Sequence, residues 1–257
     1  MNPSFYLPAS WPDSETTKQL SVKPANVHAY TTLRSGGFST AGYSEFNLAD
    51  HVDDDPQAVV KNRAKLVEDL SLPSEPAWLE QVHSNKVIRA DDLSAGQTVQ
   101  ADASFTSKQA VVCVVMTADC LPVFICNQAG TEVAVAHAGW RGLHAGIITN
   151  TVKAMNSAAD ELLVSLGPAI GAREFEVGED VLHAFVDKNS ANKSAFVATK
   201  KGHYLCDIYQ LARIELQSLG VKKIAGGDCC TYREEQRFYS YRRQQKTGRM
   251  ASLIWFT

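Results

Sequence analysis

The chain has no apolar stretch that approaches the roughly 20 residues needed to span a bilayer. Its first 22 residues also lack a basic segment followed by a long apolar core, the pattern of a secretory signal. We therefore expect no membrane partner, and the sequence predicts a cytoplasmic location.

An excess of basic residues is also missing. The 25 Lys and Arg residues stand against 28 Asp and Glu residues, which gives a net charge of −3, and the basic residues are scattered along the chain. Nucleic-acid binding usually requires a basic face. No nucleic-acid partner is therefore expected.

Cysteine is sparse, with six residues in 257, and a chain of this length can build a core without disulfides. Cys113 and Cys126 lie in runs rich in Val and Ile, so we expect them to be buried as small apolar side chains. At least one of the neighbours Cys229 and Cys230 is expected to be structural. Only Cys120 stands in a segment of functional character.

Strand-like and helix-like segments alternate along the chain. The predicted strands cover 27–33, 78–83, 86–90, 111–116, 121–126, 132–137, 162–166, 223–225, 238–241 and 251–256. The predicted helices cover 55–70, 143–155, 179–186 and 208–219. The continuous apolar run at 111–116 is typical of a strand covered on both faces. This pattern predicts one layered α/β or α+β domain over residues 1–257.

Three short segments place a reactive side chain where a predicted strand ends. They are Gln81-Val82-His83, Thr117-Ala118-Asp119-Cys120-Leu121-Pro122 and His137-Ala138-Gly139-Trp140-Arg141-Gly142. Two imidazoles and one thiolate form a ligand set that zinc accepts, with a fourth position left for water. Taken singly, a structural histidine or an inert buried cysteine is the plainer interpretation. A metal site at His83, Cys120 and His137 therefore depends on the fold bringing them together.

Longer segments make the chain resemble the bacterial YfiH family. They are 117–122, 137–142, 167–171 with 175–178, and 239–243 with 247–251, and the resemblance runs from about Thr31 to Trp255. Members have been described as laccase-domain or polyphenol oxidase proteins and as purine nucleoside phosphorylases. The resemblance implies a layered αββα sandwich with mixed β-sheets, similar to the catalytic domain of cytotoxic necrotizing factor. It also implies that His83, Cys120 and His137 bind zinc.

The same resemblance implies phosphorolysis of adenosine, inosine and methylthioadenosine, together with adenosine deamination. The expected partners are then a small nucleoside and phosphate. Zinc suits deamination because it lowers the pKa of a bound water from 15.7 to about 7. Phosphorolysis needs an anion site, for which Arg34, Arg141 and Arg242 are the candidates, although each could instead be a surface or packing residue. Asp119 is a candidate acid/base group that could instead cap the corner it occupies.

Two other reactions and a non-catalytic role stay open at this point. Two histidines and one cysteine also suit a blue-copper site. A four-copper laccase is excluded, because it needs several His-x-His pairs and the seven histidines, at positions 28, 51, 83, 137, 144, 183 and 203, form none. A metal-free hydrolase would use Cys120 as nucleophile and His137 as base, with a role in peptidoglycan-precursor editing, but it leaves His83 without a task. The remaining alternative is a binding module. The sequence does not indicate an oligomeric state.

Overall fold

The computed structural model describes residues 5–12, 23–94 and 96–257. Of the N-terminal stretch interpreted above as lacking a signal, residues 1–4 and 13–22 lie outside this described part. Within the described part, no helix has both the length and the apolar character needed to cross a bilayer.

Two large sheets form the centre of the molecule. The first has the strand order β1 (Tyr6–Pro8), β2 (Val27–Thr32), β15 (Met250–Phe256) and β7 (Cys113–Thr117). The second has the order β14 (Lys223–Gly226), β10 (Leu162–Leu166), β8 (Leu121–Asn127), β9 (Val133–Ala138), β6 (Ala103–Thr106) and β4 (Val87–Arg89). The second sheet is mixed, since β10 pairs with β14 and β4 with β6 in parallel while the other pairs are antiparallel.

Five α-helices and two small sheets complete the fold. The helices are α1 (Pro56–Leu70), α2 (Trp140–Ala145), α3 (Ile147–Ala154), α4 (Glu179–Lys188) and α5 (Ile208–Ser218). A three-stranded sheet has the order β11 (Glu176–Gly178), β13 (His203–Cys206) and β12 (Phe196–Lys200), and β3 (Leu79–Glu80) pairs with β5 (Val99–Gln100). The mixed α/β class and the mixed six-stranded sheet are therefore as expected.

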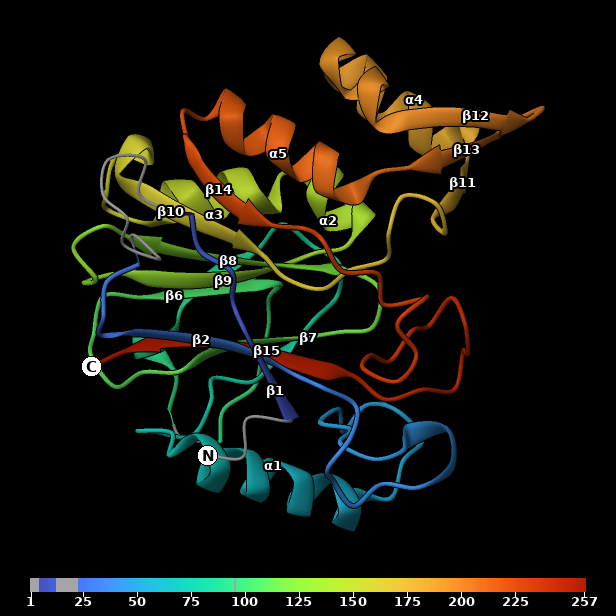
Figure 1. Cartoon of the computed structure of the whole chain (residues 1–257). Coiled ribbons are helices and arrows are strands. Elements are labelled where there is room, and N and C mark those ends of the chain that lie inside the picture. Colours follow the sequence, from blue (N-terminus) through green and yellow to red (C-terminus); the bar gives the residue numbers. More distant parts are fainter. Residues whose placement is uncertain (1–4, 13–22, 95) are drawn as a thin grey trace.

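Figure 1 shows the layers, with α2, α3 and α5 on the outer face of the six-stranded sheet and α1 beneath the four-stranded sheet. Separate apolar clusters fill the three spaces between these layers. Leu143 and Leu211 pack with the six-stranded sheet, Phe124 and Ile254 lie between the sheets, and Leu66 packs under the four-stranded sheet. Because both large sheets are covered on both faces, their central strands carry unbroken apolar runs. The similarity to cytotoxic necrotizing factor and the single-domain organisation stay predictions.

Most of the predicted elements are confirmed within a few residues. Strands β2, β7, β8, β9, β10, β14 and β15 and helices α1, α4 and α5 all occupy their predicted segments. Cys113 and Cys126 are fully buried, as expected, and Cys230 is buried with its Sγ accepting a hydrogen bond from the Gly171 amide at 3.3 Å. The strands with fewer large apolar residues, such as β6 with the sequence Ala-Ser-Phe-Thr, were not predicted.

The predicted strand at 238–241 is wrong. Phe238 and Tyr239 are fully buried, but they pack in a loop beside Ala118 and Met250 rather than in a sheet. The Arg243 guanidinium donates to the carbonyl of Phe238 at 2.7 Å, and the Phe238 amide donates to Glu234 O at 3.0 Å. Local side-chain and turn hydrogen bonds thus replace the strand partners that the apolar pattern suggested.

Two further elements differ from their predicted bounds. The helix expected at 143–155 begins earlier, at Trp140, and is broken at Gly146, whose φ of +92° lies in the left-handed region that ends helices. The strand expected at 78–83 stops after Glu80, because the amides of Val82, His83 and Ser84 donate to the carboxylate of Asp102 instead of to a neighbouring strand.

Glu132, directly before β9, ties the six-stranded sheet to the segment that follows α3. Its buried carboxylate accepts hydrogen bonds from the amides of Asn156 and Ser157 and from both of their side chains, at 2.7–3.2 Å. Glu132→Ala leaves these donors unsatisfied, so we expect the free energy of unfolding in urea to fall by about 2–4 kcal/mol. Glu68→Ala, at an exposed position of α1, is the control and should change it by less than about 0.5 kcal/mol.

Candidate metal site and active-site cavity

The His83 segment is shaped by a single buried carboxylate. Asp102 is fully buried and accepts hydrogen bonds from the amides of Val82, His83 and Ser84 at 3.3, 3.0 and 2.6 Å, and from the Ser84 hydroxyl at 2.7 Å. His83 itself has a φ of +57°, a conformation that is unfavourable for residues with a Cβ atom. The hydrogen bonds to Asp102 offset this cost and turn the His83 side chain away from the strand direction.

The same carboxylate orients the second histidine. His137 lies near the end of β9, is buried, and places its Nδ1 2.8 Å from Asp102 Oδ1. Its amide also donates to the Asp102 carbonyl at 2.7 Å. With Nδ1 engaged by the carboxylate, Nε2 is the ring nitrogen left to bind a metal, an arrangement common for histidine ligands.

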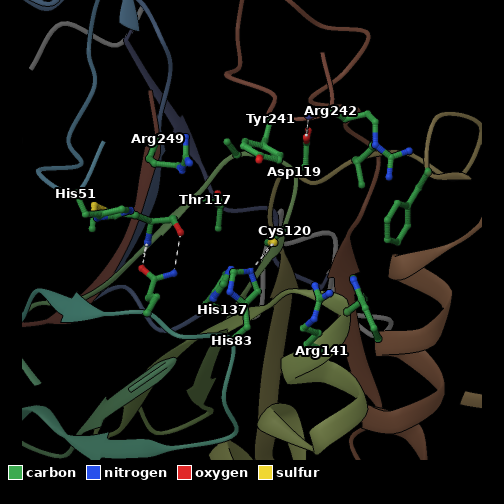
Figure 2. Close-up of a pocket in the computed structure, with 16 residues that line it drawn as sticks. His51, His83, Thr117, Asp119, Cys120, His137, Arg141, Tyr241, Arg242 and Arg249 are labelled. Carbon is green, nitrogen blue, oxygen red and sulfur yellow. Dashed lines mark hydrogen bonds between the residues drawn. The ribbon is translucent and has the colours of Figure 1, made fainter. Parts of the chain in front are cut away.

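Cys120 reaches both histidines from a corner between the two large sheets. Strand β7 ends at Thr117 in one sheet and β8 begins at Leu121 in the other, so Ala118-Asp119-Cys120 crosses between them. The Cys120 Sγ lies 3.8 Å from His83 Nε2, and one ligand atom each from His83, Cys120 and His137 all lie within 4.8 Å of one another. The structure therefore brings together the three predicted ligands, as Figure 2 shows.

A glycine makes room for this close approach. A Cβ atom at Gly139 would lie 2.9 Å from Cys120 Sγ and 2.9 Å from His83 Cδ2, closer than Cβ contacts in proteins occur. Gly142, one turn later in α2, passes close to the carbonyl of Ser84, which a Cβ would approach to 2.9 Å. The glycines that flank Trp140-Arg141 are thus explained by the packing of α2 against the His83 segment.

The three groups form an alternating chain of charges. Burial opposes ionisation of the Cys120 thiol, but the charge of His137 and hydrogen bonds from both histidines outweigh it and lower its pKa to about 6. Burial likewise opposes protonation of His137, yet Cys120 and Asp102 raise its pKa. For Asp102, hydrogen bonds from His137 and Ser84 outweigh burial and lower the pKa to about 2. A thiolate and a carboxylate on either side of an imidazole create a site that favours a cation.

The donor set fits a divalent metal ion. Two imidazole nitrogens and one thiolate are the ligands that borderline-soft metals such as zinc accept, and three protein ligands leave a position for water or substrate. His83 is exposed, Cys120 is half-buried and His137 is buried, so the open side of the group faces solvent. Among the described residues, His83, Cys120 and His137 form the only such cluster.

The cluster lies in a cavity of about 520 Å³, a size typical of small-molecule sites. Besides the three ligands, the cavity is lined by the side chains of His51, Gln81, Met116, Thr117, Ala118, Asp119, Trp140, Arg141, Ile170, Phe175, Tyr241, Arg242 and Arg249. Gln81 joins two of its walls, since its side-chain amide donates to Met116 O at 2.8 Å and accepts from Met116 N at 2.7 Å. These two hydrogen bonds fix the position of Gln81 in the cavity wall.

Asp119 connects the Cys120 corner to the C-terminal segment. Its Oδ1 accepts a hydrogen bond from the Thr231 hydroxyl at 2.6 Å, and its Oδ2 accepts one from the Arg242 amide at 2.7 Å. Its own φ is +90°, and its carbonyl accepts from Ile170 N at 3.0 Å. These contacts support the capping alternative, although the capped groups belong to distant segments. The acid/base role of Asp119 stays a prediction.

The structure separates the three predicted arginines. Arg141 and Arg242 line the cavity and stack on Trp140 and Phe175, with guanidinium-to-ring distances of 4.4 and 5.6 Å. Arg34 does not line it. Its guanidinium donates to the carbonyls of Ser44 and Glu235 at 3.2 and 3.0 Å, beside a different surface cavity. A substrate role for Arg34 therefore gains no support from its position.

Sequence reasoning missed three residues of the site. Asp102 stands between two alanines, Ala101 and Ala103. An acidic residue in such an apolar segment was the signal that could have indicated its role in the site. Arg249 lies in the segment 247–251, which carries part of the family resemblance. His51 was not among the predicted site residues, and the tertiary structure brings it to the cavity.

We expect Asp102→Asn to weaken Zn²⁺ binding by roughly 10- to 100-fold, because the amide no longer provides a negative charge at His137 Nδ1. The affinity is measured by competition with a chromophoric chelator. Ser84→Ala, which removes one hydrogen bond to Asp102 but keeps its charge, is the control and should have a smaller effect. A folded Asp102→Asn protein with wild-type Zn²⁺ affinity would contradict the role assigned to this carboxylate.

Comparison with known proteins places this site in a family. Residues 28–257 match the family model described as multi-copper polyphenol oxidoreductase laccase. A purine nucleoside phosphorylase of Pseudomonas aeruginosa is 51% identical over 233 residues, covering 90% of this chain and 94% of the relative. The purine nucleoside phosphorylase YfiH of Escherichia coli is 48% identical and covers 91% of this chain and 95% of its own length.

Solved structures agree over almost the whole chain. A Neisseria meningitidis protein superposes with a TM-score of 0.92 at 45% identity, over 98% of this chain and 99% of its own. YlmD of Geobacillus stearothermophilus gives a TM-score of 0.85 at 27% identity, over 97% and 99% of the two chains. The chain that assembles His83, Cys120 and His137 in this cavity therefore belongs to the YfiH family.

Proposed function

We propose that the protein is a zinc-dependent purine nucleoside phosphorylase that also deaminates adenosine. The observation that carries the proposal is the convergence of His83, Cys120 and His137 in a cavity of nucleoside size. The relatives named as purine nucleoside phosphorylases support it, since they are about half identical over nine-tenths of the chain.

His83, Cys120 and His137 would hold the zinc ion, and Asp102 would fix the ring of His137. When bound, zinc supplies a Lewis acid that polarises a coordinated oxygen or nitrogen. The rings of Trp140 and Phe175 offer apolar faces for a purine, as aromatic side chains do at other nucleobase sites. Arg141 and Arg242 remain candidates for contacts with anionic groups.

Phosphorolysis joins an oxygen of inorganic phosphate to the ribose C1′ while the bond from C1′ to the purine nitrogen breaks. The base takes the electron pair of that bond and one proton, and it leaves as free purine beside ribose 1-phosphate. The site must therefore hold phosphate and nucleoside together, and positive side chains near the cavity centre stabilise the anionic reactant. Deamination adds water at C6 of adenosine and releases ammonia, so it needs no phosphate.

The alternative of a cysteine nucleophile has one observation in its favour. Cys120 has a lowered pKa, and His137 is oriented by Asp102 at 2.8 Å, which together match the general arrangement of nucleophile, base and orienting carboxylate. His83 beside Cys120 is explained better by a metal site, because a nucleophile needs only one base. A single-copper oxidase remains the other alternative and would require copper-dependent oxidation of a phenol.

The phosphorylase proposal predicts one zinc ion per chain and release of adenine from adenosine that depends on added phosphate. His83→Ala should remove most bound zinc and lower phosphorolysis by at least roughly 100-fold, because one of three ligands is lost. Metal content and the separation of adenine from inosine by chromatography measure both effects. His183→Ala, at an exposed position outside the cavity, is the matched control. The proposal is refuted if the purified wild-type protein contains no zinc and His83→Ala retains full phosphorolysis.

Cys120→Ser separates the metal site from the nucleophile alternative. A serine hydroxyl is a much poorer zinc ligand than a thiolate, so we expect zinc content and phosphorolysis to fall together and excess Zn²⁺ to restore part of the activity. Parallel zinc and activity titrations provide the measurement. Full zinc content with complete loss of activity would instead favour Cys120 as a nucleophile.

A further inference from the structure

Arg249 is a half-buried cation inside the cavity that no carboxylate pairs with in the described part of the chain. Its Nη1 donates to the carbonyls of Thr247 and Gly248 at 2.6 and 3.1 Å, which orients the guanidinium. Burial lowers the pKa of Arg249, while the nearby Cys120 thiol and Asp119 act in the opposite direction. Both oxygens of Asp119 already accept hydrogen bonds from other groups. A partly desolvated positive charge without a carboxylate partner is costly, and an anionic ligand would relieve that cost.

His51 lies at the same end of the cavity. Burial and the charges of Arg249 and Arg63 lower its pKa, with Asp50 acting in the opposite direction. Its Nδ1 is 3.7 Å from Asp50 Oδ1, and Asp50 also pairs with Arg63 at 3.2 Å. Arg249 and His51 therefore line the same cavity close enough to interact, and each carries N–H groups that can donate hydrogen bonds.

The backbone holds these two side chains in a fixed relation. The buried side chain of Asn47 accepts a hydrogen bond from the Arg249 amide at 2.9 Å, and the Leu48 amide donates to the Arg249 carbonyl at 3.4 Å. His51 follows these residues by only a few positions. The start of β15 and the loop that carries His51 are thus bonded to each other, so the pair is built into the fold.

The other arginines of the cavity are in a different situation. Figure 2 shows Arg249 and His51 on one side of Cys120 and Arg141 and Arg242 on the other. Arg141 and Arg242 are exposed, and the guanidinium of Arg242 donates to the carbonyls of Glu174 and Glu176 at 3.2 and 3.3 Å. Exposed charges in contact with water bind anions less strongly than partly desolvated ones.

From this arrangement we propose that Arg249 and His51 form the subsite for inorganic phosphate, across the ligand cluster from the aromatic faces of Trp140 and Phe175. The proposal rests on the phosphorylase function and adds to it a residue assignment. Phosphate then enters the cavity on the Arg249 side and the purine lies on the side of Arg141 and Arg242. Arg249 supplies charge-assisted hydrogen bonds from a planar fork, a geometry that suits phosphate oxygens.

Arg249→Lys and Arg249→Gln test the assignment through the phosphate dependence of adenine release. We expect the KM for phosphate to rise by roughly 10- to 100-fold, because each variant loses hydrogen bonds to a charged ligand. Deamination of adenosine to inosine by the same protein should fall much less than phosphorolysis, since it consumes no phosphate. Arg233→Gln, at an exposed position outside the cavity, is the control and should leave the KM for phosphate unchanged.

A binding measurement makes the test independent of turnover. Inorganic phosphate should raise the Tm of the metal-free wild-type protein in a saturable manner, because a ligand of the native state stabilises it, and it should have no such effect on Arg249→Gln. If the Arg249 variants do not fold, His51→Asn, which alters an exposed loop residue, provides the same two measurements.

The outcomes separate this assignment from the function on which it rests. If the Arg249 variants fold and keep an unchanged KM for phosphate, the subsite assignment is overturned while phosphorolysis stands. The same holds if the KM for phosphate rises only in Arg141→Gln and Arg242→Gln. Conversely, saturable stabilisation of the wild type but not of Arg249→Gln, in a protein without phosphorolysis, would keep the anion subsite and refute the phosphorylase.

Discussion

The buried carboxylate of Asp102 determines the geometry of the candidate metal site. It accepts three consecutive backbone amides around His83 and the ring Nδ1 of His137, so it fixes one ligand through the main chain and the other through its side chain. Protein hydrogen bonds to one carboxylate therefore orient both candidate histidine ligands.

The second constraint is the passage of the chain between the two large sheets. Because β7 and β8 belong to different sheets, the corner that carries Cys120 lies at the edge of both. The C-terminal segment is held against this edge by Asp119, and the loop that carries His51 is held to β15 by Asn47. Segments that are far apart in the sequence thus line one cavity.

This geometry bears on the two descriptions attached to the family. The family model carries the name of a multi-copper laccase, whereas the relatives that are about half identical to this chain are named as purine nucleoside phosphorylases. One His/Cys cluster in the described part of the chain, and the absence of His-x-His pairs from the whole sequence, do not provide for several coppers. One candidate metal site, with an arginine in the same cavity that no carboxylate pairs with among the described residues, suits an anionic reactant.

The sequence alone determined the central strands, because runs such as 111–116 are satisfied in a sheet covered on both faces, and it identified the three candidate ligands through residue type and family resemblance. Sequence reasoning missed Asp102 and His51 and did not fix the position of Arg34, and it predicted a strand at 238–241 that the structure does not contain. The pattern of apolar residues along the sequence indicates which segments are buried. It does not indicate their hydrogen-bond partners, because those partners come from distant segments. Only the tertiary structure decides which charges meet, since their pairing depends on packing between layers rather than on local sequence.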